Sequence, residues 1–172
     1  FEARCRQGDI DFRWRGRIAG RAEGTLEFEF DGEALRDFER NRIGFCVLHG
    51  ASLAGRSCAV EHVDGRTETG RFPASIEGTA PWVDLRAIAH EVAPGMRAEV
   101  RMEGDAFEME DQRNWGDASF KTFCTPLRLP RPVRLTRGTR VRQKITVRLL
   151  GRPEVPPPTF SPPWQAPPEV RG

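Results

Sequence analysis

The chain has 172 residues, enough for one domain with a hydrophobic core. Its 27 Lys and Arg residues nearly balance 25 Asp and Glu residues, and the acids are interleaved with the arginines, so a nucleic-acid partner is not expected. No apolar run approaches the length of a membrane span, so we expect no membrane partner and take a cytoplasmic location as the default.

The cysteines and histidines do not form a recognisable metal or redox motif. Cys5, Cys46, Cys58 and Cys124 show no C-x-x-C spacing, and we expect buried free thiols rather than disulfides. The three histidines also lack the spacing of metal ligands. We therefore predict neither a metal site nor a cofactor.

The first third of the chain alternates apolar and charged residues, as strands do. Residues 1–5 already alternate, and residues 11–31 form the clearest hairpin, with arginines on one strand facing glutamates on the other. Ala34, Leu35 and Phe38 have helical spacing, which predicts a short helical turn over residues 33–40. The run 43–49 is too apolar for a half-exposed strand and predicts a central one.

The rest of the chain predicts further strands joined by Gly and Pro turns. We expect strands at 58–62 and 66–72 around an Asp64-Gly65 turn, a loop over 73–81, and strands at 85–92, 96–102 and 140–150. Gly104-Asp105 is expected to make a hairpin into the strand that starts at Phe107. Such a series, without a long helical period, predicts an all-β protein with an antiparallel β-sandwich. The expected core residues are Trp14, Leu26, Phe28, Phe45, Val47, Val100, Phe107 and Met109.

Composition divides the chain into two regions. Residues 1–150 are expected to form the β-sandwich domain. Residues 151–172 include eight prolines, too many for pairing in a sheet, and predict an extended, polyproline-like linker.

The densest group of polar side chains lies in residues 107–124, FEMEDQRNWGDASFKTFC. The segment opens as an alternating strand, runs through a polar stretch and returns to apolar residues at Phe120 and Phe123. One interpretation is a charged surface hairpin whose Asp and Asn residues cap turns. The other is a functional loop.

This segment closely resembles a signature of the D-apionate lactonase family, in which a strand leads into E-D-Q-R-N-W-T-D-A-S-[FY]-K-T. Residues 41–49, NRIGFCVLH, resemble the family's N-R-x-G-F-x-x-L-H segment, and shorter matches follow in order at 60–65, 71–73 and 90–95. Two positions depart from the pattern. Gly116 stands where the family usually has Thr, and Gly50 follows His49 where Pro is usual.

The resemblance implies that this chain is the amino-terminal β domain of a longer enzyme that continues into a barrel-like domain and a further β domain. Such an enzyme hydrolyses D-apionolactone to D-apionate in the breakdown of apiose. The implied partners are therefore a small sugar-acid lactone and the barrel-like domain of the same chain. That domain could hold the catalytic carboxylates, in which case residues 107–124 would line the substrate pocket from one side.

Opening a lactone requires an activated water, a stabilised oxyanion and a protonated leaving group. The candidate acid/base residues are Glu108, Glu110 and Asp111. The candidate substrate-binding residues are Arg113, Asn114, Trp115, Asp117, Lys121, Asn41, Arg42 and His49. We expect the polar side chains between 108 and 121 to converge on one concave face. No G-x-S-x-G motif is present, which disfavours a serine hydrolase.

Structural roles remain open for the same residues. Glu108 and Glu110 could form the solvated face of a strand, and Arg113 could hold the loop by pairing with an aspartate. Asn41-Arg42 could shape a turn, and His49 could be a structural histidine. Two other functions also remain open: a non-catalytic, carbohydrate-binding or accessory sandwich of a glycoside-hydrolase-like enzyme, and a fragment of a glycoside hydrolase itself.

Overall fold

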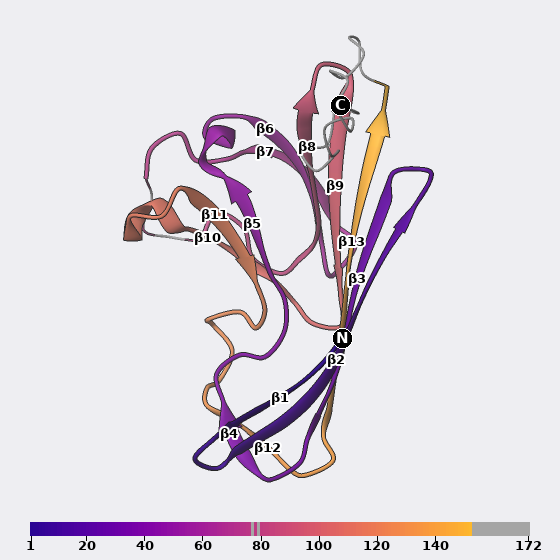
Figure 1. The fold of residues 1–172 in the computed structure, drawn as a ribbon. Coiled ribbons are helices and arrows are strands. Elements are labelled where there is room, and N and C mark those ends of the chain that lie inside the picture. The colour runs from indigo at the N-terminus through magenta and orange to yellow at the C-terminus, as the bar shows by residue number, and fades with distance from the viewer. Residues whose placement is uncertain (77, 79, 153–172) are drawn as a thin grey trace, which may run out of the picture.

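The computed structural model describes residues 1–76, 78 and 80–152, whose regular secondary structure is almost entirely antiparallel strand (Figure 1). Two short 3-10 helices, η1 (Ala51–Leu53) and η2 (Gln112–Trp115), interrupt them. The strands are β1 (Glu2–Gln7), β2 (Ile10–Arg21), β3 (Thr25–Ala34), β4 (Phe38–Arg40), β5 (Cys46–Gly50), β6 (Ser57–His62), β7 (Thr67–Arg71), β8 (Leu85–Ala93), β9 (Met96–Glu103), β10 (Glu108–Asp111), β11 (Ser119–Phe123), β12 (Val133–Leu135) and β13 (Arg140–Gly151).

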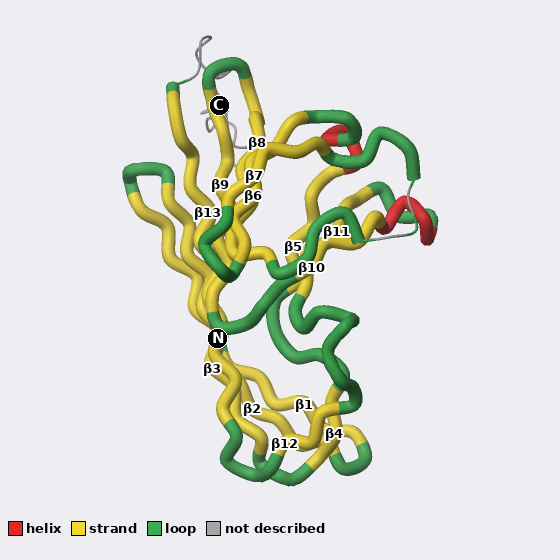
Figure 2. Tube along the Cα trace, turned by 180° about the vertical axis from the view of Figure 1, so that it is seen from behind, coloured by secondary structure: helices red, strands yellow, loops and turns green. Residues whose placement is uncertain are grey.

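The described strands form one large sheet and two small ones. The large sheet has eight strands in the order β1-β2-β3-β13-β9-β8-β6-β7. The small sheets, β10-β11-β5 and β12-β4, lie on one side of it, and Figure 2 shows the same arrangement from behind. The predicted antiparallel β-sandwich is confirmed.

In the β2–β3 hairpin, the alternating charged residues form ion pairs between the two strands. The strands pair in register from Phe12 opposite Ala34 to Arg21 opposite Thr25. Arginines on β2 reach glutamates on β3 across the solvated face, with N–O distances of 3.2 Å for Arg13–Glu33, 3.4 Å for Arg17–Glu29 and 2.8 Å for Arg21–Glu27. Exposed pairs of this kind contribute little, so burial of the opposite face must drive folding.

Two clusters of buried side chains hold the layers together. The larger lies between the three-stranded sheet and strands β6, β8, β9 and β13, and its fully buried members include Phe72, Leu85, Ile88, Met102, Phe107, Met109 and Phe120. The smaller lies where β4 and β12 meet the β2–β3 hairpin and contains Phe12, Phe30, Ala34, Phe38 and Leu135.

A strip of apolar side chains on the large sheet is only partly covered by the small sheets. Ile18 pairs with Phe28, which pairs with the core residue Ile145, so all three side chains share the core-facing side of the sheet. Ile18 is nevertheless 61% exposed, and Leu26 and Leu149 are 45% and 47% exposed. We call Ile18, Leu26, Phe28, Val147 and Leu149 the apolar strip.

This uneven coverage explains how the predicted core residues fared. Val100, Phe107 and Met109 are buried, as predicted. The other five are less buried than predicted: Trp14, Phe28, Phe45 and Val47 are half-buried at the margins of the two clusters, and the prediction for Leu26 was wrong because this residue is exposed.

The predicted helical turn at 33–40 is also wrong. Residues up to Ala34 continue β3, the chain turns a corner, and Phe38 begins β4. The corner is fixed by backbone and side-chain bonds, including Leu35 N to Asp11 O at 2.8 Å and Arg137 N to the Asp37 carboxylate at 2.9 Å. Ala34 and Phe38 face the same cluster from successive strands, which imitates helical spacing.

Two further expectations about strand position were wrong. The run 43–49 contains only the short strand β5, at the edge of the three-stranded sheet, because Ile43 and Phe45 leave the run to pack between the layers. Gly104-Asp105 does not join paired strands: β10 pairs with β11, so the chain crosses here to the other layer. Gly104 has a positive φ of 92° and packs on the backbone of Arg142, where a Cβ would collide.

The remaining expectations concern thiols, membranes and the tail. All four cysteines are free; Cys58 and Cys124 are buried, as expected, but Cys5 and Cys46 are exposed. Among the residues described, no helix is long and apolar enough to cross a bilayer, and no cluster of three metal-ligating side chains occurs. The predicted linker from residue 153 onward lies outside the described residues, and the division near residue 150 stays a prediction.

The difference between the covered and uncovered faces can be measured. Phe107→Ala should lower the free energy of unfolding by about 3–5 kcal/mol, because it leaves a cavity between the layers. Leu26→Ala, on the apolar strip, should cost less than about 1 kcal/mol. Urea denaturation followed by circular dichroism tests both. Equal losses would contradict the described layering.

Candidate functional site

The motif segment forms a hairpin whose connection is a turn of 3-10 helix. Strand β10 leads into η2, and β11 returns antiparallel with Glu110 opposite Lys121. Asp111 caps η2 by accepting the backbone N–H of Arg113 at 3.2 Å. Gly116 ends η2 with φ of 81°, a left-handed conformation that glycine adopts without strain. The departure from Thr at this position therefore suits the local backbone.

Asp111 and Arg113 form a buried clamp at the base of this turn. The Asp111 side chain faces the core and is only 1% exposed. Arg113 donates to both of its carboxylate oxygens, Nε to Oδ1 at 2.8 Å and Nη2 to Oδ2 at 2.7 Å. The guanidinium also lies 4.5 Å from the ring centroid of Phe120.

The clamp also holds a distant loop. Arg113 donates to three consecutive backbone carbonyls, those of Pro73, Ala74 and Ser75, at 2.9, 3.3 and 3.1 Å. The bonds of this one guanidinium thus link the motif turn to the segment that follows β7. Removing it would leave the Asp111 charge buried and the loop unattached.

His49 lies on the inner face of β5. It is buried, and its Nε2 lies 3.1 Å from the hydroxyl of Thr122. Burial, with a smaller contribution from His90 nearby, lowers the pKa of His49 from 6.5 to about 4. The imidazole is therefore neutral near pH 7 and makes core contacts, its ring centroid lying 6.0 Å from that of Phe72.

The outer face of the same hairpin carries a second group of polar side chains. Trp115 donates its indole N–H to Glu110 Oε1 at 2.9 Å, and Lys121 Nζ lies 3.7 Å from Glu110 Oε2. The Trp115 ring is 72% exposed. We call Glu110, Trp115 and Lys121 the outer trio. It presents a carboxylate, an ammonium and a flat aromatic surface side by side.

The remaining motif residues lie apart from the outer trio. Glu108 is on the same face of β10 but is buried, and it accepts the backbone N–H of Leu127 at 2.8 Å. Asn114 and Asp117 are exposed on either side of Gly116. The polar residues between 108 and 121 are therefore divided between an inner and an outer face, and they do not converge on one concave surface as expected.

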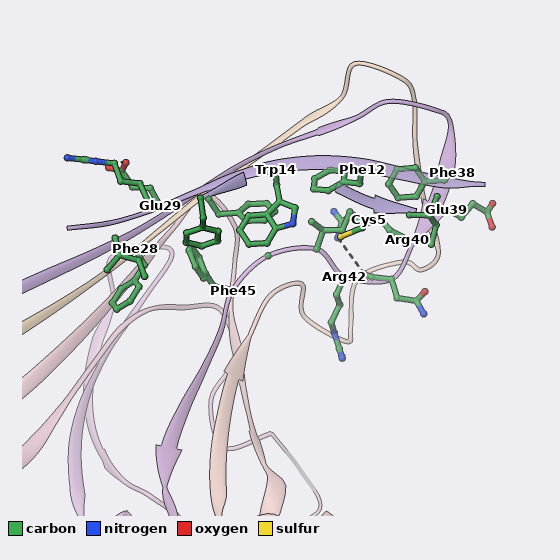
Figure 3. A pocket seen from close by; sticks show the side chains of 18 residues that line it. Cys5, Phe12, Trp14, Phe28, Glu29, Phe38, Glu39, Arg40, Arg42 and Phe45 are labelled. Carbon is green, nitrogen blue, oxygen red and sulfur yellow. Dashed lines mark hydrogen bonds and ion pairs between the residues drawn. The ribbon is translucent and has the colours of Figure 1, made fainter. Parts of the chain in front are cut away.

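Asn41 and Arg42 line a different feature, an aromatic cavity of about 940 Å³ beside the first strands (Figure 3). Arg42 also stacks over Phe123, with its Cζ 4.1 Å from the ring centroid, and donates to the Thr125 carbonyl at 3.4 Å. It therefore connects the cavity to the motif strand β11. The aromatic residues that line the cavity are Phe1, Phe12, Trp14, Phe28, Phe30, Phe38 and Phe45.

Sequence reasoning did not identify this cavity as a site. Its lining comes from β1, β2 and β3 together with the segment 38–45, so no single stretch of sequence shows it. A usable signal was the alternation of Phe12 and Trp14 along β2 with Phe28 and Phe30 along β3. That pattern predicts an aromatic sheet face but not whether another layer covers it.

Comparison with known proteins decides the family. Residues 1–152 match the family model for the D-apionate lactonase N-terminal domain. The chain belongs to this family. A D-apionate lactonase from Brucella anthropi is 47% identical over 155 residues, a match that covers 87% of this chain and 25% of that protein. The chain therefore spans about a quarter of the length of this D-apionate lactonase.

The fold is also similar to a solved structure. The crystal structure of a "Putative aldose 1-epimerase" from Escherichia coli K12 aligns with a TM-score of 0.47 and 11% sequence identity. The alignment covers 88% of this chain and 64% of the other chain.

The clamp can be tested by removing one partner. Arg113→Ala should lower the free energy of unfolding by about 3–5 kcal/mol, because the buried Asp111 charge loses its partner. The double variant Asp111→Leu/Arg113→Met, which removes both charges, should recover a large part of that loss. Urea denaturation measures both. A single variant as stable as the wild type would show that the clamp does not hold the fold.

The pH dependence of stability tests the environment of His49. Between pH 6.5 and 4 the unfolded chain takes up a proton at this residue that the folded chain does not, so stability falls as the pH drops through this window. The total loss should be about 3 kcal/mol. His49→Gln should lack this contribution, while the titration of the carboxylates remains. Parallel stability–pH curves for both proteins would contradict the neutral, buried His49.

Proposed function

We propose that this chain is the N-terminal domain of a cytoplasmic D-apionate lactonase that hydrolyses D-apionolactone to D-apionate in the breakdown of apiose. The observation that carries the proposal is the 47% identity to a D-apionate lactonase over nearly the whole domain. Because the matched part is a quarter of that relative, the rest of the active site is proposed to lie in a following, barrel-like domain of the same polypeptide.

The outer trio is the part of the motif best placed to meet a substrate. Trp115 offers an exposed ring, and its bond to Glu110 fixes the edge of that ring. The ring could pack against the apolar side of a sugar. Lys121 can donate to a developing oxyanion or alkoxide, and Glu110 can accept a proton from water. Opening a lactone requires such a donor and such a base, and the outer trio would supply both from one side of a pocket shared with the following domain.

Asp111 and Arg113 are better suited to positioning than to proton transfer. Both carboxylate oxygens of Asp111 already accept bonds from Arg113, and the guanidinium is shared with three backbone carbonyls. The clamp fixes the start of η2, and Trp115 is the last residue of η2. We therefore propose that the clamp sets the position of Trp115, while Glu108 anchors the segment around Leu127.

The aromatic cavity favours a second candidate function, a non-catalytic sandwich that binds carbohydrate. Asn41 and Arg42 stand at the cavity beside aromatic rings, a combination that can hold a sugar by stacking and hydrogen bonding. The two functions differ in which residues they need. Substitutions in the outer trio should impair hydrolysis, whereas Trp14→Ala should impair only carbohydrate binding to this domain.

The test uses the full-length enzyme that carries this domain. Glu110→Gln should lower kcat/KM for D-apionolactone by about 100-fold or more if Glu110 acts in proton transfer, and Trp115→Ala should mainly raise KM. Glu23→Gln, on the exposed turn between β2 and β3, is the matched control and should leave both constants unchanged. The free energy of unfolding should change by less than about 0.5 kcal/mol in all three variants. Wild-type turnover in Glu110→Gln and Trp115→Ala would remove the outer trio from the active site.

A further inference from the structure

The backbone of β5 is paired on one side by β11. Ala51, just after β5, donates its N–H to the carbonyl of Ala118 at 3.0 Å, so these two residues form a hydrogen-bonded pair of the antiparallel ladder. Such pairs alternate with non-bonded pairs along a ladder. Val47 and His49, two and four residues before Ala51, therefore also turn their backbone groups toward β11.

The other side of β5 is an unpaired edge. The intervening residues of this strand turn their backbone N–H and C=O groups away from β11. We call them the edge residues: Cys46, Leu48 and Gly50. All three are exposed, and within the part of the chain that the structure describes their backbone groups have no hydrogen-bond partner. A row of unpaired backbone groups is a template for an added strand.

The covered area of the large sheet ends along an oblique line. Three successive rows of core-facing residues cross β9, β13, β3 and β2. The first exposed residue is Leu149 on β13 in one row, Leu26 on β3 in the next and Ile18 on β2 in the third. Coverage therefore ends one strand further out in each row, and the apolar strip lies along this line.

Strand β5 follows the same oblique line. The Phe45 ring, just before β5, lies 6.1 Å from the ring of Phe30 on β3, whereas His49 lies 5.9 Å from His90 on β8. The segment thus crosses from β3 over β13 and β9 to β8. Ring contacts place β11 on the side of β5 that is nearer β7. The free edge of β5 therefore faces the apolar strip (Figure 1).

We propose that a β-strand of a separate domain pairs with the edge residues and covers the apolar strip. Neighbouring strands of a sheet lie about 4.8 Å apart, so the next strand beyond β5 would run over Leu149, Leu26 and Ile18. Its backbone would bond to the edge residues, and alternate side chains would fill the strip. The occupant is thus an extended segment that has an apolar side chain at every second position and retains its backbone N–H groups.

These requirements favour a separate domain over the other possible occupants. A second copy could pair through its own β5, but the inward side chains there, Val47 and His49, pack in their own core and could not also fill the strip. The eight prolines of residues 152–172 lack the N–H groups that strand pairing requires. A separate domain as the source rests on the proposed place of this chain in a longer enzyme, whereas the pairing chemistry does not.

Amide hydrogen exchange of the 172-residue chain, measured by NMR, tests the pairing. In the free protein the edge residues should exchange rapidly, and Val47 and His49 should be protected by β11. The probe is an acetylated and amidated peptide of sequence KVTVTVK, which has an apolar residue at every second position. At about 1 mM it should slow exchange of the edge residues about 3-fold or more.

Two N-methylated probes are matched controls for the backbone bonds. When the probe lies antiparallel to β5 with its valines on the strip, its threonines turn their N–H groups to β5 and its valines turn theirs away. N-methylation of both threonines should abolish the protection, whereas N-methylation of two valines should leave it within about 2-fold. The opposite pattern would indicate parallel pairing, and equal effects of both would overturn the proposed backbone pairing.

A substitution on the apolar strip tests the second contact surface. Leu26→Asp places a charge where the valines would pack, and it should return the edge residues to their rate in the free protein. Val63→Asp is the matched control, because Val63 is also exposed, at 42%, but lies outside the strip. Circular dichroism checks that both variants keep the fold. Equal protection by the probe in both variants would show that the strip takes no part.

The exchange rates also distinguish the possible occupants. Rapid exchange of the edge residues in the free chain, slowed only by the probe and only with Leu26 in place, supports the proposal. Protection in the free chain that disappears on dilution would assign the edge to a second copy, and protection at every concentration would assign it to the chain itself. Either result, or no effect of the probe, would overturn the proposal. None of these measurements depends on lactone hydrolysis.

Discussion

The ion pair between Asp111 and Arg113 is the interaction on which the motif depends most. A carboxylate this deeply buried requires a partner that satisfies both oxygens, and a guanidinium two residues along the chain does so with parallel bonds. The same cation packs on Phe120 and binds the loop at 73–75. The Arg113 side chain therefore contacts the turn η2, the strand β11 and the distant loop at once. Lysine, which lacks the planar fork of arginine, could not make all of these bonds.

The motif hairpin has a buried face that stabilises the fold and an exposed face that carries the outer trio. Alternate residues of β10 point to opposite faces, so Asp111 and Met109 stabilise the interior while Glu110 faces solvent with Lys121 and Trp115. A rigid interior turn holds the exposed group in place. Such support by packed neighbours is what a binding wall needs if its side chains are to meet a substrate in a fixed geometry. The long polar motif is thus explained by stability on one face and by proposed chemistry on the other.

The sequence predicted the parts of the fold that depend on local alternation. The β2–β3 hairpin, the β6–β7 pair and strands β8, β9 and β13 follow their apolar and charged pattern. The prediction failed at residues 33–40 and 43–49, where apolar side chains belong to different layers, and at Leu26, whose face is not covered. Alternation shows which side of a strand is apolar. It does not show where the opposing layer ends, since that depends on contacts between residues far apart in sequence.

The candidate site, too, could be predicted only where it depends on residues close together in the sequence. The motif residues were found from their types, but the clamp and the aromatic cavity arise from contacts across the fold.

The large sheet ends in β1 and β7, which carry charged residues such as Arg4 and Glu68. One edge of the three-stranded sheet is β5, where the exposed Leu48 and Cys46 flank Val47. Charge protects the first two edges from pairing with another chain, and β5 lacks that protection. The backbone of β5, residues Cys46–Gly50, is therefore an edge at which two copies of the isolated domain can pair.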